Sequence, residues 1–195
     1  LIKNCINSKA KMDKIITEII LPCIPQIQKL FDDGKIGKSE QQLMNGIIAN
    51  SIQMITQHSG KAESGKNVII LSADAESSLI SEAAGAAFRS QNWNVFFIGD
   101  MSSSIDVLFD LELRKLLSKI WKSKEGVMII IIFSQSEEGL KFFSDSFYSV
   151  KEKSENNMLI VLSGKTGKKV KIKADLSSPK LEDILQWSNT TFENI

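Results

Sequence analysis

The sequence predicts an α/β protein in which an amino-terminal helical bundle precedes a doubly wound parallel sheet of about five strands. The first observation is that residues 8–57 carry apolar side chains at helical spacing alone. The second is that strand and helix patterns alternate from residue 67 onward, as in chains that build parallel sheets. The third is that the strand segments are apolar at nearly every position, which is typical of strands covered on both faces.

The amino-terminal part contains at least two predicted helices. Over Ser8–Asp33 the apolar residues recur every three or four positions, and Pro22 and Pro25 are expected to kink or divide this helix. A second helix is predicted over Ser39–Gln57. The polar segment Gln57–Lys66 then separates the two patterns, so we divide the chain into a helical bundle subdomain (1–60) and a sheet domain (61–195).

The rest of the chain alternates between strands and helices. Strands are predicted at Asn67–Ala73, Asn94–Ile98, Val127–Phe133 and Met158–Leu162, with a short strand at Val170–Ala174. Helices are predicted at Ser77–Ser90, Ser104–Trp121, Glu137–Lys153 and Pro179–Thr190. Doubly wound sheets bind ligands at the carboxyl ends of their strands, so the loops after Ala73, Ile98, Phe133 and Leu162 form the candidate site.

Composition excludes several classes of function. The net charge of +1 creates no field that predicts nucleic-acid or membrane binding. The longest apolar run, Val127–Phe133, is far shorter than the roughly 20 residues that a membrane helix needs. Cys5 and Cys23 form no CxxC pair, so we expect neither disulfides nor a cysteine metal site, and the reducing cytoplasm is the expected compartment.

The chemistry-bearing residues do not assemble into an enzyme signature. His58 is the single histidine and lies at the polar end of a predicted helix, where a solvated or capping role is favoured. The acidic residues Asp74, Glu76, Asp100 and Asp106 follow strands and are expected to cap helices. A phosphoacceptor domain stays open as a minor alternative, although Phe133-Ser134 replaces the acceptor aspartate that it requires.

A lysine-rich segment follows the fourth predicted strand. Gly164–Lys169 superficially matches a phosphate-binding loop, but it follows a late strand and precedes no helix. A solvated hairpin is therefore favoured over a phosphate site.

Several positions keep a family spacing while their residue types differ. They are Phe31, Gly34 and the pair Gln41-Gln42 in the bundle, Glu76, Ser78 and Ser81 after the first strand, Ser134 after the third, and Ser163-Gly164 after the fourth. With these positions the chain resembles the cobalamin-binding module, a helical bundle plus a flavodoxin-like domain, of MerR-type light-responsive transcriptional repressors. It is less similar to the module of methionine synthase.

The resemblance assigns a role to each position. Phe31 corresponds to a tryptophan that covers the cofactor, and Gln41-Gln42 to a glutamate–histidine pair. Glu76 corresponds to an acidic residue, Ser78 to the histidine that coordinates cobalt, and Ser81 to a glycine. Ser134 corresponds to a serine that meets the cofactor's nucleotide tail, and Gly164 remains from a pair of glycines.

The changed residues alter the expected chemistry. A serine hydroxyl is a poor ligand for cobalt and glutamine binds metals weakly, so we expect no cobalamin and no metal. Methyl-transfer and mutase relatives depend on the corrinoid itself, so no catalytic activity is expected either.

We therefore predict a regulatory domain, sensing or oligomerising, of a MerR-type transcriptional regulator. It would form a homo-oligomer or bind a protein partner, contact no membrane, and reach DNA only through a segment preceding Leu1. The alternative is a small-molecule domain that binds a nucleotide, tetrapyrrole or corrinoid. Its crevice would be lined by Phe31, Gln41, Gln42, Glu76, Ser78 and Ser134.

Overall fold

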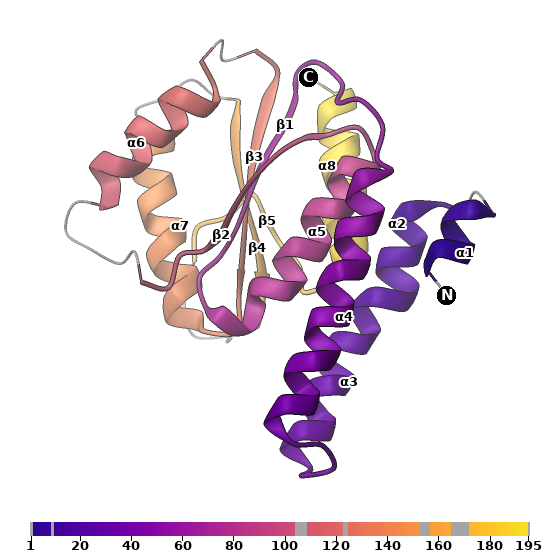
Figure 1. Cartoon of the computed structure of the whole chain (residues 1–195). Helices are drawn as coiled ribbons and strands as arrows, with labels where there is room; N and C mark the ends of the chain where they lie inside the picture. Colours follow the sequence, from indigo (N-terminus) through magenta and orange to yellow (C-terminus); the bar gives the residue numbers. More distant parts are fainter. Residues whose placement is uncertain are drawn as a thin grey trace.

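A five-stranded parallel sheet with helices on both faces forms the centre of the molecule (Figure 1). The computed structural model describes residues 2–8, 10–103, 109–122, 125–152, 157–164 and 172–194. The strands are β1 (Lys66–Ser72), β2 (Asn94–Asp100), β3 (Val127–Ser134), β4 (Met158–Gly164) and β5 (Leu176–Ser177). Their order β2-β1-β3-β4-β5 confirms the predicted doubly wound architecture with amino-terminal helices.

The sheet is covered by helices because its central strands are apolar on both sides. Every residue of β3 is buried, and its Ile130 is in register with Ile69 of β1 and Ile160 of β4. One face packs against α6 (Phe109–Ile120) and α7 (Glu137–Lys151), and the other against α5 (Ser78–Ser90) and α8 (Leu181–Glu193). A strand that is apolar throughout thus requires a helical layer on each side.

The amino-terminal helices form a further layer outside α5. They are α1 (Ile2–Asn7), α2 (Met12–Ile15), the π-helical segment η1 (Ile16–Ile20), α3 (Leu21–Asp32) and α4 (Lys38–Gln57). The two prolines follow the π-helical segment directly, with Pro22 in the first turn of α3 and Pro25 inside the helix. The predicted interruption therefore takes the form of a π-helical segment before α3.

One hydrophobic cluster joins these helices to the sheet. Ile16, Ile52 and Ile55 from the helical layer belong to the same cluster as Val68 and Ile129 from the sheet. The division at residues 60 and 61 stays a prediction, but the helical layer and the sheet share their core.

The edge strand near the carboxyl terminus lies at a different place from the one that the sequence predicted. The strand predicted at Val170–Ala174 begins outside the described residues, and residues 172–174 belong to no strand. The edge strand is Leu176–Ser177, which pairs with Val161 and Leu162 of β4. Before it, the Lys173 carbonyl accepts a hydrogen bond from Ser144 Oγ of α7, and the Asp175 N–H donates to the Ile160 carbonyl of β4.

The predicted helix in the sequence before β3 agrees with the observed helix α6 over the described residues. The helix predicted at Ser104–Trp121 is seen as Phe109–Ile120, and residues 104–108 lie outside the described residues. Within the described chain, no helix is both long and apolar enough to cross a membrane.

A chain of side-chain hydrogen bonds ties the outer helices to the sheet layer. Trp93 Nε1 donates to Asn189 Oδ1 of α8 at 3.0 Å, and Asn189 Nδ2 donates to Gln91 Oε1 at 2.7 Å. Gln91 Nε2 in turn donates to Asp13 Oδ2 of α2 at 3.3 Å. Because Trp93 is only 1% exposed, its indole N–H depends on Asn189 as its acceptor.

We predict that Asn189→Ala lowers the free energy of unfolding by about 1–3 kcal/mol, because it leaves a buried donor without an acceptor. Urea denaturation measures this change. Asn194→Ala, at the exposed end of the same helix, is the matched control and should change stability by less than about 0.5 kcal/mol. Equal effects of the two substitutions would contradict the assigned role of Asn189.

Candidate functional site

The direction in which the chain crosses the sheet reverses between β1 and β3. The loop after β1 and the loop after β3 therefore diverge at the carboxyl edge of the sheet. The chain leaves β1 toward β2 on one side, and leaves β3 toward β4 on the other. Loops that diverge in this way leave a crevice, which is where doubly wound sheets bind ligands.

A cavity of about 890 Å³ occupies this position, between the sheet edge and the helical layer. Its apolar lining comes from Leu21, Ile24 and Pro25 of α3, Leu79 and Ile80 of α5, and Phe133 of β3. Its polar lining includes Gln28, Lys29 and Asp32 of α3, Asn45 of α4, and Glu76, Gln135 and Ser163 from the sheet edge. The volume lies within the range of small-molecule sites, and both walls combine apolar surface with a few polar groups.

Asp74 connects the two loops that diverge at the switch point. Its Oδ2 accepts a hydrogen bond from Ser134 Oγ at 2.6 Å and from the Gln135 backbone N–H at 2.8 Å, while Oδ1 accepts from the Ser77 N–H at 2.8 Å. Partial burial alone would raise the pKa of Asp74, but these hydrogen bonds favour the ionised form and hold its pKa below the usual value. The carboxylate thus fixes the loop after β1 against the loop after β3.

Gly164 brings the end of β4 close to the end of β3. A Cβ atom at this position would overlap the backbone carbonyl oxygen of Ser134, its partner in the strand register. It would also lie 3.1 Å from Leu140 Cδ1 of α7. The absence of a side chain is therefore required for the packing of the sheet edge.

The predicted site residues occupy different places relative to the crevice. Glu76 lines it and is exposed, whereas Ser78 begins α5 and the crevice-lining residues of that helix are its neighbours Leu79 and Ile80. Ser134 is buried and serves as a donor to Asp74. Of this group, only Glu76 contributes directly to the lining.

The predicted residues of the bundle lie behind or beside the lining. Gln41 Nε2 donates to Gln28 Oε1 at 2.9 Å, and Gln28 Nε2 donates to Asp32 Oδ1 at 2.8 Å, so Gln41 positions a lining side chain. Gln42 is exposed and Phe31 half-buried, and neither is among the residues that line the crevice.

Sequence reasoning missed the polar face of α3. Gln28 and Asp32 lie one helical turn apart, and they continue the face that begins with Leu21, Ile24 and Pro25. The sequence signal that could have identified these residues is one helix face that is apolar in its first turns and polar in its last turns.

The described residues were compared with the requirements of a metal-binding site. No group of three or more histidine, cysteine, aspartate or glutamate side chains could hold a metal ion there. His58 lies at the end of α4 with its Nδ1 2.7 Å from the Met54 carbonyl oxygen. Asp106 and the lysines of residues 165–171 lie outside the described residues.

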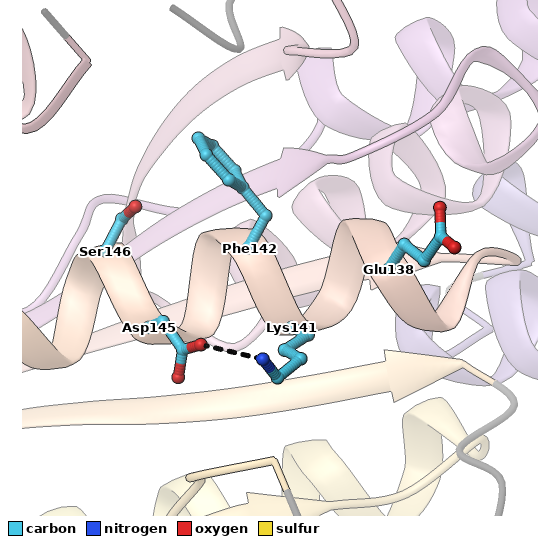
Figure 2. Close-up of a pocket in the computed structure, with 5 residues that line it drawn as sticks. All are labelled: Glu138, Lys141, Phe142, Asp145 and Ser146. Atoms are coloured by element: carbon cyan, nitrogen blue, oxygen red, sulfur yellow. Dashed lines mark ion pairs between the residues drawn. The ribbon is translucent and has the colours of Figure 1, made fainter. Parts of the chain in front are cut away.

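A second hollow on the surface of α7 lacks converging groups. Figure 2 shows Lys141 and Asp145 pointing to one side of the helix, where they form an ion pair at 3.7 Å, while Phe142 points to the opposite side. Because these side chains do not face a common point, the crevice at the sheet edge is the stronger candidate site.

No protein-family model matches the chain, and no curated protein matches its sequence. Among solved structures, it is similar to the monomethylamine corrinoid protein of Methanosarcina barkeri, with a TM-score of 0.67 at 12% sequence identity. The match covers 100% of this chain and 89% of that chain. The likeness confirms that the chain has the fold of a cobalamin-binding module, while the relation to MerR-type repressors stays a prediction.

We predict that Asp74→Asn lowers stability at pH 7 by about 1 kcal/mol, because an amide cannot accept the same set of hydrogen bonds. Since the pKa of Asp74 is lowered in the folded state, its stabilisation is fully present above the ordinary value of 3.8 and is lost as the pH falls through the lower folded-state value. Urea denaturation at pH 7 and below pH 3.8 measures the free energy of unfolding of both proteins. The difference in this free energy between Asp74→Asn and wild type should be smaller at the lower pH.

Glu76→Gln is the control for this experiment, because it neutralises an exposed carboxylate of the same loop. It should retain the acid-dependent loss of stability that Asp74→Asn removes. A difference between Asp74→Asn and wild type that is equal at both pH values would refute the role of the Asp74 carboxylate.

We predict that Gly164→Ala destabilises the fold by about 1–3 kcal/mol, because the added methyl group overlaps the β3 backbone. Gly46→Ala is the matched control, since a Cβ there meets nothing within 4 Å and alanine favours the helix. Thermal denaturation should give a lower Tm for Gly164→Ala and an unchanged or higher Tm for Gly46→Ala.

Proposed function

We propose that this chain is a non-catalytic sensing domain whose crevice binds a small amphipathic molecule. The observation that carries the proposal is the crevice of about 890 Å³ at the switch point, with apolar surface on both walls and amide and hydroxyl groups among its lining.

The lining favours recognition by hydrogen bonds and apolar contact. Gln28, Asn45 and Gln135 carry amides that donate and accept, and Ser163 carries a hydroxyl. The opposing apolar surfaces of α3 and α5 suit a flat body with polar substituents. A nucleotide base or a tetrapyrrole has this combination of properties.

The donor set does not fit a cobalt ion coordinated by the protein. The loop after β1 contributes Ala75 and Glu76 to the lining, and the other polar groups of the lining are the carboxylates of Asp32 and Asp33, amide or hydroxyl groups, and the Lys29 ammonium. Carboxylate and carbonyl oxygens suit magnesium, calcium and manganese better than cobalt, which favours a nitrogen donor. A corrinoid would have to bind through its periphery, with its own base retained on the metal.

The location of the crevice supports a sensing role. One wall belongs to α3 and α4 and the other to the sheet edge, so a ligand that touches both walls favours one arrangement of these layers. Such a bias can be transmitted to self-association, to a protein partner, or to a DNA-binding segment of a transcriptional regulator of the MerR type.

A thermal-shift screen with nucleotides, a haem-type tetrapyrrole, adenosylcobalamin and hydroxocobalamin, in the dark and without oxygen, tests the proposal. We expect at least one class to stabilise the protein, by about 2.7 kcal/mol at 100 times its Kd. Leu79→Trp fills the crevice and should abolish this stabilisation, whereas Gln53→Trp adds the same bulk on the exposed side of α4 and should retain it.

The outcome of the thermal-shift screen distinguishes between the candidate ligand classes. Stabilisation by a cobalamin with its absorption spectrum unchanged indicates binding without protein coordination. If no class stabilises the folded protein, the proposed ligand-binding function is wrong.

A further inference from the structure

Helix α4 carries no charge along nearly its whole length, although one side of it is exposed. Residues 41–60 contain no aspartate, glutamate, lysine or arginine, in a chain of which 24% is charged. The exposed side of a surface helix ordinarily carries charged and polar residues. The exposed positions of this stretch of α4 instead carry two large apolar side chains among uncharged polar ones.

Two of the most exposed large apolar side chains lie on this side. Leu43 is 67% exposed and Ile47 is 56% exposed, one turn apart, while Ile48, Ile52 and Ile55 face the core. With Asn50 and Met54, they form a second row along the helix at spacings of four, three and four residues. We name these four residues, Leu43, Ile47, Asn50 and Met54, the outer seam.

We propose that the outer seam pairs with the outer seam of a second copy of this chain, α4 against α4 in antiparallel orientation. The four-three-four spacing is the repeat of a helix-pairing seam. It also reads the same in both directions, as a two-fold contact between identical helices requires. Leu43 then lies opposite Met54 of the second copy, and Ile47 opposite Asn50.

The lack of charge on the outward side of α4 favours a second copy of this chain as the partner of the outer seam. In a two-fold contact each surface meets itself, so a charged surface would repel its own copy, whereas the uncharged outward side of α4 does not. A partner selected by opposite charge would have nothing to recognise there.

The position of α4 leaves room for this contact. Figure 1 shows the hairpin of α3 and α4 extending past the sheet, so this end of α4 lies clear of the α/β layers. Asn45 lines the crevice, and at 3.6 residues per turn it points away from Ile47, on the opposite side of the helix. The pairing is therefore compatible with an open crevice.

Sedimentation equilibrium over a range of protein concentrations tests the pairing in the purified chain. The wild-type protein should form dimers, and Ile47→Glu should raise the dimer Kd by more than about tenfold because it places a charge in the seam. Gln53→Glu, which adds the same charge to an exposed position of α4 outside the seam, should leave the Kd within about threefold. Since Ile47 is exposed in the single chain, circular dichroism and the Tm measured at concentrations below the wild-type dimer Kd should match the wild type.

Cross-linking tests the orientation separately, in a background with Cys5→Ser and Cys23→Ser. A mixture of Ile47→Cys chains and Asn50→Cys chains should form disulfide dimers faster than either variant alone. A wild-type protein that stays monomeric, a dimer insensitive to Ile47→Glu, or a mixture that cross-links no faster than the separate variants would each overturn the proposal.

Discussion

The structure depends on helix α5 being buried on both sides, by the sheet on one and by the amino-terminal helices on the other. The helix can fill this position because its middle turns, Ala83–Ala87, carry only alanine and glycine, all of them buried. Small side chains let the two neighbouring layers approach closely and share one core. At the amino end of α5 the side chains become larger, with Leu79 and Ile80, and there the layers separate around the crevice.

The sheet edge beneath the crevice is held in one arrangement by a polar network. Asp74 collects hydrogen bonds from Ser134 and from two backbone N–H groups, and Ser134 Oγ in turn accepts from the Ser136 N–H at 3.0 Å. Gly164 allows the ends of β3 and β4 to approach each other beside it. A site whose walls are fixed before a ligand arrives loses less conformational freedom on binding. This fixed edge, together with a wall contributed by a separate helical layer, is the physical basis for the sensing role that we propose for the crevice.

The sequence predicted the fold better than it predicted the site, for reasons visible in particular residues. Continuous apolar strands such as Val127–Phe133 require cover on both faces, so the sheet and its helical layers follow from pattern alone. The edge strand lies later than predicted, and the Lys173 carbonyl before it is hydrogen-bonded to Ser144 of α7, a tertiary contact that no local pattern reports. In the site, motif spacing located Glu76 but selected Ser78 and Phe31, because spacing does not say which turn of a helix faces the crevice. Gln28 and Asp32 were missed for the same reason, although the resemblance pointed to the same edge of the sheet as the crevice.

The proposed function requires ligands to bind in the crevice between α3 and the sheet edge. The most direct test is a backbone amide NMR titration of the isotope-labelled chain with the nucleotide and tetrapyrrole classes. We expect one ligand to shift the signals of Gln28, Glu76 and Gln135 together and with one Kd, since these residues lie on different elements around one cavity. Shifts confined to other surfaces, such as the hollow on α7, or no shifts with any of these ligands, would contradict it.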